Sequence, residues 1–291
     1  MSSAPIILLT SLAMTAFAGN SLLCRAALKQ TEIDPASFTA IRLISGAVVL
    51  WLVVRMRQGA QNGKGNWLSA LALFAYAAGF SFAYVSLSAA SGALLLFGAV
   101  QATMIGYGLW KGERLIWPQF IGLILAGGGL IGLLLPGLSA PPLAGSLLML
   151  AAGVAWGIYS LRGKSAGDPT RVTAGNFLRT VPIVALLSLP MLNHLSFDPA
   201  GVGYAVASGA LASGIGYVIW YTALPALQAT HAAILQLSAP LLAALGGIAF
   251  LGEPLTLRII LASAAILGGI ALVILERQQV QRVQHVVPER E

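Results

Sequence analysis

The chain has 291 residues, of which 58% are hydrophobic and only 9% are charged. Soluble domains carry about 25% charged residues, so this composition excludes a water-exposed globular protein. The net charge of +7 does not indicate a nucleic-acid-binding protein, because the basic residues lie between apolar runs and not on a polar domain.

Ten apolar runs, each about as long as a membrane span, fill the chain from residue 5 to residue 275. In chain order they occupy residues 5–28, 35–56, 66–88, 91–110, 116–135, 142–162, 172–192, 200–223, 227–250 and 255–275. The connections are short and leave no room for a soluble domain between spans. The sequence therefore predicts an all-α polytopic membrane protein with ten transmembrane helices, followed by a polar tail at residues 277–291.

The basic residues predict the orientation of the chain in the membrane. With a cytoplasmic N-terminus, eleven of them fall in inside segments: Arg55, Arg57, Lys64, Lys111, Arg114, Arg162, Lys164, Arg171, Arg277, Arg282 and Arg290. Three fall in outside segments: Arg25, Lys29 and Arg258. Because cytoplasmic segments carry an excess of Lys and Arg, we predict a multi-pass protein of the cell inner membrane with both termini, and the tail, in the cytoplasm. A signal peptide is disfavoured, since no Lys or Arg precedes the first run.

The second half of the chain repeats the first. At a shift of 140 residues Gly112-Glu113 falls on Gly252-Glu253. At a shift of 134, Asp34-Pro35 followed by Thr39-Ala40 falls on Asp168-Pro169 followed by Thr173-Ala174. We therefore divide the chain into two five-helix repeats, residues 1–138 and 139–276. Because five is odd, the second repeat enters the membrane inverted relative to the first, an arrangement that surrounds a central cavity in carriers.

These features resemble the drug/metabolite transporter superfamily, in its EamA-type branch. The resemblance is carried by the ten spans, by Gly19-Asn20 in the first span, and by Lys111-Gly112-Glu113 and Leu251-Gly252-Glu253-Pro254 after the fourth span of each repeat. It covers about residues 5–276, and within the superfamily the chain is similar to the YddG-type exporters of aromatic and other amino acids. The resemblance implies a ten-helix basket with a cavity lined mainly by helices 1, 3, 4, 6, 8 and 9, and with helices 5 and 10 at the periphery.

Aromatic residues at helical spacing are the first candidates for substrate binding. Three spans carry them: Tyr76, Phe80 and Tyr84; Trp156 and Tyr159; and Tyr217, Trp220 and Tyr221. Such rings suit a zwitterion with an aromatic or apolar side chain, because they stack on that side chain and hold the ammonium group by cation–π contact. The alternative is an interfacial belt or simple packing, which is favoured for Tyr84 and Tyr221 near the span ends.

Amide side chains at membrane depth are the second set of candidates: Asn20, Gln101, Asn176 and Gln236. An amide in hydrocarbon needs a hydrogen-bond partner, so these groups are expected to face the bundle interior or water. The alternative is an interhelical hydrogen bond. For Asn20 and Gln236, on helices that the resemblance assigns to the cavity, we favour substrate binding.

Four further residues are candidates for gating or for a structural role. Arg42 and Arg179 lie in equivalent spans; snorkelling or interhelical bonding is favoured over pairing with a carboxylate or with the substrate's carboxyl group. His231 begins the ninth span, and Pro240 lies in its middle, where it removes a backbone donor and acts as a kink or a hinge. No span carries a central Asp or Glu, which disfavours proton antiport through a carboxylate.

The sequence thus predicts an inner-membrane carrier that exports aromatic and other neutral amino acids by alternating access, with facilitated transport favoured over proton antiport. Export of other small metabolites or drugs is the alternative in the same class. The predicted partners are the amino-acid substrate and the lipid bilayer, with no nucleic acid. A monomer is sufficient for this function.

An intramembrane enzyme or a channel is the alternative of another class. Ser91 and His231 are repeat equivalents, so inversion separates them by roughly the ~30 Å of a bilayer, whereas a nucleophile and its base lie ~3 Å apart. Cys24 is the single cysteine, and no metal-ligand cluster or phosphate loop is found in the sequence. We therefore predict no enzyme activity, no metal and no cofactor.

Overall fold

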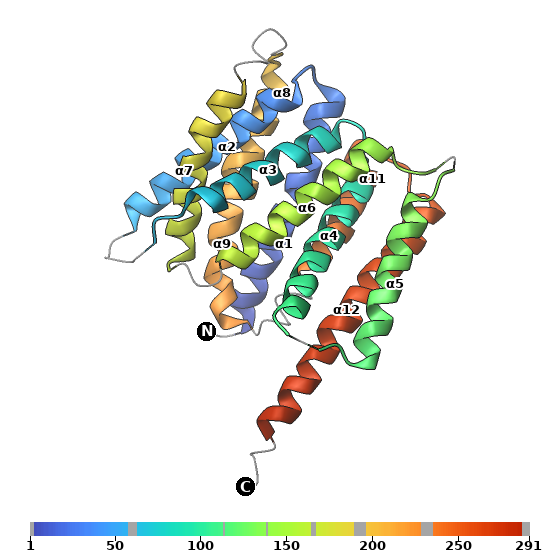
Figure 1. Ribbon diagram of the computed structural model, residues 1–291. Helices are drawn as coiled ribbons and strands as arrows, with labels where there is room; N and C mark the ends of the chain where they lie inside the picture. Colours follow the sequence, from blue (N-terminus) through green and yellow to red (C-terminus); the bar gives the residue numbers. More distant parts are fainter. Residues whose placement is uncertain are drawn as a thin grey trace.

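In a computed structural model, residues 3–57, 63–112, 114–137, 139–163, 167–188, 196–227 and 235–286 are described, and each regular element in these ranges is a helix. The helices form one bundle, with α5 and α12 side by side at its edge (Figure 1). Within the described residues, eight helices are long and apolar enough to cross a membrane. The prediction of an all-helical polytopic membrane fold is confirmed.

The helices follow the predicted spans closely. In chain order they are α1 (Ser3–Gln30), α2 (Pro35–Met56), α3 (Trp67–Tyr84), α4 (Ala89–Trp110), α5 (Trp117–Leu134), α6 (Leu143–Gly163), α7 (Pro169–Ser188), α8 (Pro199–Val206), η2 (Ala207–Ile215), α9 (Gly216–Ala223), η3 (Leu224–Ala226), α11 (Ser238–Leu251) and α12 (Leu257–Val286). The four elements from α8 to η3 are continuous and form one span, Pro199–Ala226. Two predicted spans are not among the eight: α7, which carries Arg171 and Arg179, and α11, whose described length is 14 residues.

Asp34 begins α2 and also ties it to the segment before α8, in the second half of the chain. Its Oδ1 accepts hydrogen bonds from the N–H groups of Ala36 and Ser37, both at 2.9 Å, and Pro35 takes the first helical position, where no donor is needed. Its Oδ2 accepts from the N–H of Ser196, ahead of α8, at 2.9 Å. Burial raises the pKa of the Asp34 carboxyl, but the hydrogen bonds that it accepts lower this pKa by more, to below its ordinary value.

The helices pack in pairs that an inverted repeat would produce. Helix α2 packs on α7, α5 packs on α12, and α4 packs on α11, each pair joining one predicted repeat to the other. In the same way α6 packs on α3 and α4, while α1 packs on α9 and α11. This pattern is symmetric under exchange of the two halves, and we infer that the predicted pseudo-two-fold relation organises the bundle.

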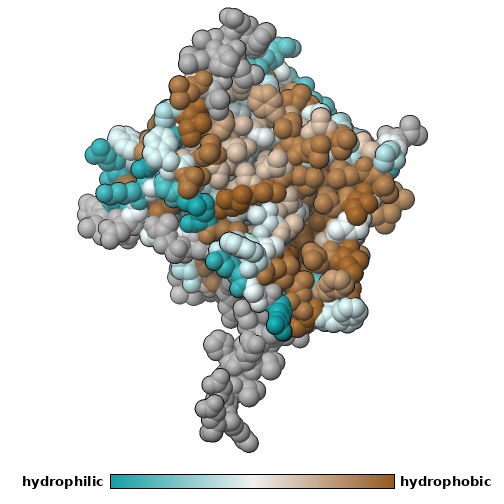
Figure 2. All heavy atoms as spheres, in the orientation of Figure 1, coloured by the Kyte–Doolittle hydropathy of each residue, from teal (hydrophilic) through white to brown (hydrophobic). Residues whose placement is uncertain are grey.

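Helices α5 and α12 form a close pair with an apolar outer face. A Cβ added to Gly122 of α5 would lie 2.6 Å from the carbonyl oxygen of Gly269 in α12, so the two backbones touch. Ile124 of α5 and Leu261 of α12 are about 60% exposed. Figure 2 shows hydrophobic residues covering this side of the molecule, as expected of a surface that faces lipid.

Two helices depart from regular α geometry beside the centre of the bundle. Span Pro199–Ala226 contains a nine-residue π-helix, η2. The ninth predicted span is interrupted at Leu237, and α11 begins at Ser238, so Pro240 lies in the first turn of a helix and not in its middle. This corrects the predicted position of the proline: because Pro240 has no N–H, the carbonyl of Gln236 lacks its helical donor, and the helix breaks there.

The C-terminal helix is longer than the span predicted from the sequence. Residues 255–275 were expected to cross the membrane, but α12 continues to Val286, so most of the polar segment predicted as a tail extends this helix.

Candidate functional site

A cavity of about 500 Å³ lies inside the bundle, between α1, α3, α4, α6, α7 and the span that contains η2 and α9. Ten of the eleven residues predicted to bind substrate line it: Asn20, Tyr76, Phe80, Gln101, Trp156, Tyr159, Tyr217, Trp220, Tyr221 and Gln236. Asn176 of α7 lines it as well. The structure thus brings the two sets of candidates, aromatic rings and amides, to one place.

Trp156 is the centre of the aromatic wall of this cavity. Its ring stacks on Tyr159 at a centroid distance of 5.2 Å and on Tyr217 at 5.4 Å, and its centroid lies 4.7 Å from that of Tyr76. These rings come from three helices, α3, α6 and α9, and aromatic pairs at such distances stabilise one another. The wall is therefore held in shape before a solute arrives.

A polar cluster lies beside this wall where α1, α2, α3 and η2 meet. The hydroxyl of Tyr76 accepts hydrogen bonds from Nη2 of Arg42 at 2.8 Å and from Nδ2 of Asn20 at 3.1 Å. Oδ1 of Asn20 accepts from the hydroxyl of Ser208 at 2.7 Å. Arg42 is 1% exposed and stands behind Tyr76, so its charge is buried beside the cavity.

A second polar cluster links α3, α6 and α7. Nδ2 of Asn176 donates to the hydroxyl of Tyr159 at 3.4 Å, and Oδ1 of Asn176 accepts from the N–H of Asn66 at 2.9 Å. Arg162 donates to Oδ1 of Asn66 and to the hydroxyl of Ser69, both at 3.2 Å. Asn66 is the N-cap of α3, so this cluster lies toward the opposite end of α3 from Tyr84.

The cavity reaches one end of the bundle. Its lining includes Gly163 at the end of α6, Pro169 at the start of α7 and Leu227 after η3. These residues lie at the end that also holds the N-terminus of α1, which we call the α1 N-terminal end. The opposite one is the α1 C-terminal end.

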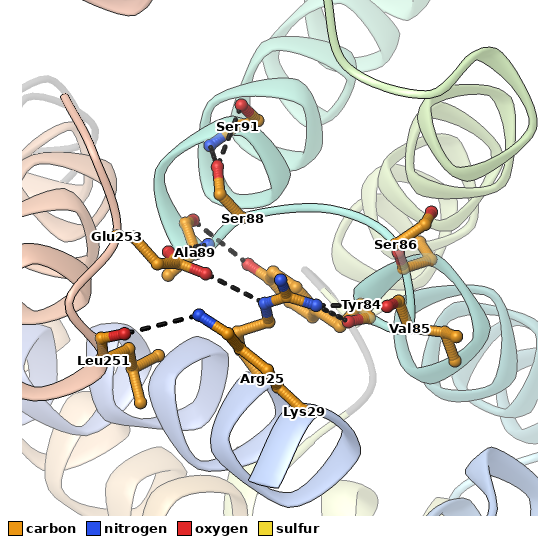
Figure 3. A network of polar contacts seen from close by, with 11 residues as sticks. Arg25, Lys29, Tyr84, Val85, Ser86, Ser88, Ala89, Ser91, Leu251 and Glu253 are labelled. Atoms are coloured by element: carbon orange, nitrogen blue, oxygen red, sulfur yellow. Dashed lines mark hydrogen bonds and ion pairs between the residues drawn. The ribbon is translucent and has the colours of Figure 1, made fainter. Parts of the chain in front are cut away.

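The α1 C-terminal end is closed by an ion pair. Nε of Arg25 donates to Oε1 of Glu253 at 2.9 Å, and Nη1 of Arg25 donates to the carbonyl oxygens of Tyr84 and Val85 at 2.9 and 3.1 Å. Oε2 of Glu253 accepts from the N–H of Ala89 at 2.7 Å. Figure 3 shows these contacts joining α1, the α3–α4 connection and the segment after α11. We call this group the Arg25–Glu253 lock.

Tyr84 is the one predicted substrate-binding residue that does not line the cavity. Its side chain is fully buried, its ring packs edge-on against Phe80 at 4.7 Å, and its hydroxyl donates to the carbonyl of Ala89. The ring lies under the lock, which agrees with the packing alternative for a residue near a span end.

The two arginines in equivalent spans have different surroundings. Arg42 does not snorkel, because α2 carries it into the bundle interior and Tyr76 bonds it there. Arg179 is half-buried and donates to the carbonyl oxygens of Lys64 and Gly175 at 2.6 and 2.8 Å. Interhelical bonding therefore describes Arg42, and Arg179 fastens the segment before α3 to α7. His231 lies outside the described residues.

Several lining residues were not predicted: Phe17, Phe97, Met104, Thr173 and Ser213. A helical spacing of three or four from a predicted residue would have found four of them. Phe17 is three residues before Asn20, Phe97 and Met104 flank Gln101 by four and three, and Ser213 is four before Tyr217. Thr173 was noted only as part of the repeat.

The chemistry of the cavity suits reversible binding of a small solute. The described residues that line it include no acidic or basic side chain, and they combine rings, amides and hydroxyls. Within the described part of the chain no three His, Cys, Asp or Glu side chains come together as a metal site would require. Such a wall binds by stacking and hydrogen bonding.

Comparison with known proteins places these features in a family. The EamA-like transporter family model matches residues 4–135 and again residues 143–275. An uncharacterised protein of Pseudomonas aeruginosa is 58% identical over 93% of this chain and 95% of its own length. A solved crystal structure with 21% sequence identity superposes with a TM-score of 0.63 over 94% of this chain and 99% of that chain. That likeness concerns the fold alone.

Relatives with a stated activity match over a shorter stretch. The threonine/homoserine exporter RhtA of Escherichia coli is 37% identical over 52% of this chain, and that of Salmonella typhimurium is 37% identical over 57%. The chain spans little more than half the length of these two proteins, 52% and 58%. The family match, in contrast, covers nearly all of the chain. This helical membrane protein with a central aromatic cavity belongs to the EamA-like transporter family.

Proposed function

We propose that the protein is an inner-membrane carrier that exports amino acids, aromatic and other neutral ones, by alternating access. The observation that carries the proposal is a cavity that reaches one end of the bundle while the Arg25–Glu253 lock closes the other. A carrier exposes its binding site to one side at a time, and a bundle closed at one end is one of the two states that it needs.

The size and lining of the cavity support an amino-acid substrate. A volume of about 500 Å³ lies within the range of small-molecule sites, roughly 300–1,000 Å³. Stacked rings such as Trp156 and Tyr217 offer a surface to an apolar or aromatic side chain, and Asn20 and Tyr76 offer hydrogen bonds to a polar head group. The similarity to proteins named threonine/homoserine exporters points to the same substrate class.

The proposed orientation places both termini, and the open end of the cavity, in the cytoplasm, from which an exporter takes its substrate. The support is the distribution of Lys and Arg between the connections. A reporter that is active only in the cytoplasm, fused to Glu291, should give signal, and a reporter active only in the periplasm should not. The reverse result would overturn the orientation.

The test of function is counterflow in proteoliposomes. Vesicles loaded with unlabelled phenylalanine or threonine should accumulate the same labelled amino acid from outside, with saturation, and empty vesicles should not. Saturation with counterflow separates a carrier from a channel. If no amino acid in a panel is exchanged by protein that is folded and inserted, the proposal is wrong, and other small metabolites or drugs become the substrate class to test.

We propose facilitated transport and not carboxylate-coupled proton antiport. The support is that the described lining residues include no Asp or Glu, and that the predicted spans place every acidic residue at an end or in a connection.

A further inference from the structure

Arg42 carries a positive charge in a place where the fold leaves part of it unsatisfied. It is 1% exposed, and its guanidinium carbon lies 4.8 Å from the ring centroid of Phe80 and 5.2 Å from that of Tyr76. Nη2 donates to the Tyr76 hydroxyl, but Nη1 is buried and has no hydrogen-bond partner among the described residues. A buried donor without a partner is costly, and native proteins keep few of them.

The charge of Arg42 also lacks a counter-ion in the described structure. The ion pairs found there join Arg25 to Glu253 and Arg57 to Asp168. Cation–π contacts offset part of the desolvation of a guanidinium, but a buried charge without an opposite charge remains destabilising. In membrane proteins such charges mark substrate pathways.

The equivalent position in the second half of the chain carries no charge. The shift of 134 residues that places Asp34 on Asp168 places Arg42 on Asn176. Asn176 is also 1% exposed and also donates to a tyrosine hydroxyl, that of Tyr159. A neutral amide therefore occupies the equivalent buried position in the other repeat, although its tyrosine partner comes from α6. A buried side chain at this position does not have to carry a charge.

The hydroxyl of Tyr76 relays this charge to the cavity. Its oxygen accepts from Arg42 and from Asn20, so its own proton is left for an acceptor, and no acceptor for it is found among the described residues. Tyr76 lines the cavity, whereas Arg42 stands behind it. A hydroxyl that accepts from a cation is a stronger donor, because hydrogen bonds in a chain polarise one another.

A second unpartnered donor lies on the same cavity. The hydroxyl of Ser213 in the π-helix η2 is buried and has no hydrogen-bond partner among the described residues, and Ser213 is one of the residues that line the cavity. The π-helix packs against α2 at Arg42 itself, since a Cβ on Gly209 would collide with the carbonyl oxygen of Arg42. π-helical turns are rare and occur often at functional sites.

We propose that Arg42, acting through Tyr76 and with Asn20 and Ser213 beside it, forms the site that holds the carboxylate of the substrate. The proposal rests on the proposed function and narrows it. The substrate class is then solutes with a free carboxylate, such as neutral amino acids, and cationic drugs or amides of amino acids are excluded. Arg42 is a positioning residue here, because it lies behind the hydroxyl that touches the solute.

The test compares each acid with its amide. In counterflow with labelled phenylalanine, unlabelled phenylalanine should compete at least about tenfold better than phenylalaninamide, which keeps the ring and the ammonium but lacks the negative charge. Arg42→Gln and Tyr76→Phe should each reduce this ratio toward one, mainly by raising KM for the acid, and Arg42→Lys should retain part of it. Arg57→Gln, at the end of the same helix, should leave the ratio unchanged. Equal competition by acid and amide in the wild type, or an unchanged ratio in well-folded Arg42→Gln, would overturn the proposal.

A binding measurement separates this proposal from the proposed function. Phenylacetate and phenylacetamide are titrated into the purified protein while tryptophan fluorescence, to which Trp156 contributes, is followed. Quenching by the acid but not by the amide, absent in Arg42→Gln, supports the carboxylate site even if no amino acid is exchanged. If the acid produces no quenching beyond that of the amide, the carboxylate site is wrong, whatever the transport assay shows.

Discussion

Weakening the Arg25–Glu253 lock should shift the protein toward the state that is open at the α1 C-terminal end. The carboxylate of Glu253 accepts hydrogen bonds from Arg25 at 2.9 Å and from the N–H of Ala89 at 2.7 Å. The side chain of Arg25 is 13% exposed and that of Glu253 is 6% exposed. Glu253→Gln removes the charge and one acceptor oxygen. A charge-assisted hydrogen bond contributes about 1.5–3 kcal/mol. Both groups are rehydrated when this end opens, which offsets part of that energy. The substitution should therefore destabilise the closed state by about 1–2 kcal/mol relative to the open state, which is about a five- to thirtyfold shift in the equilibrium between the two states.

Cys24 offers a native probe of this shift. It is the single cysteine of the chain, precedes Arg25 in α1, and is fully buried while the lock is closed. If opening is fast compared with labelling, the rate of modification by a small water-soluble thiol reagent is proportional to the population of the open state. The rate in Glu253→Gln should therefore rise about five- to thirtyfold above that of the wild type.

A second ion pair gives the matched control. Arg57 and Asp168 are 3.9 Å apart, and the Arg57 side chain is 40% exposed, so this pair contributes little. Asp168→Asn should change the labelling rate of Cys24 by less than about twofold. If Glu253→Gln is folded, with an unchanged melting temperature, and labels no faster than Asp168→Asn, the lock does not control access to this end.

Three further predictions follow from the cavity and the helix ends. Trp220→Ala removes a ring that lines the cavity and packs on Phe17 at 6.0 Å, so binding of phenylalanine or tryptophan should weaken about several-fold to tenfold and binding of threonine less. Equal loss for all substrates would assign Trp220 to packing. Collapse of a pH gradient across loaded proteoliposomes should leave the initial rate of transport nearly unchanged; a several-fold fall that is abolished by His231→Ala would show that the histidine couples protons. Asp34→Ala should lower the free energy of unfolding by about 0.5–2 kcal/mol at neutral pH. Because the pKa of Asp34 is lowered in the folded protein, this difference between wild type and variant should be fully present above about pH 4 and should decrease as the pH falls through the folded value; a difference that does not decrease at all as the pH falls below about 4 would show that the carboxylate is not its source.

The position of the cavity followed from the sequence because its walls obey helical periodicity. Tyr76 and Phe80 lie one turn apart on α3, Tyr217 and Trp220 lie one turn apart on α9, and each pair was predicted to line a cavity from spacing and aromatic character. Amides such as Gln101 supported the same interpretation, since a polar group at membrane depth must face the interior of the bundle. The spacing of the rings and the depth of the amides are both properties of a single helix, so the sequence alone is enough to detect them.

The features that sequence reasoning missed depend on contacts between helices. Glu253 was known only as part of a repeated Gly-Glu pair, and its partner Arg25 is 228 residues away. The burial of Arg42 depends on how deep α2 sits against Tyr76 and η2. The sequence favours snorkelling or interhelical bonding for Arg42 without deciding between them, because an arginine eight residues from a span end can do either. The π-helix η2 has no marker that was recognised in the sequence.

If the predicted inverted repeat holds, a lock at one end of the bundle implies a corresponding pair at the other end. Gly112-Glu113 is the predicted repeat equivalent of Gly252-Glu253, and Arg162 lies near the end of α6 as Arg25 lies in the C-terminal part of α1. Arg162 lies at the α1 N-terminal end, where the cavity is open, and is bonded there to Asn66 and Ser69. Glu113 lies outside the described residues, and the predicted inversion assigns it to the same end. If the two predicted repeats exchange conformations during transport, we expect Arg162 to pair with Glu113 in the state open at the α1 C-terminal end, because each repeat would then adopt the arrangement that the other has here. Removing the charge of Glu113 then destabilises the opposite state to the one that Glu253→Gln destabilises. The two variants should consequently move the labelling rate of Cys24 in opposite directions, which a lock that merely stabilises the fold would not do.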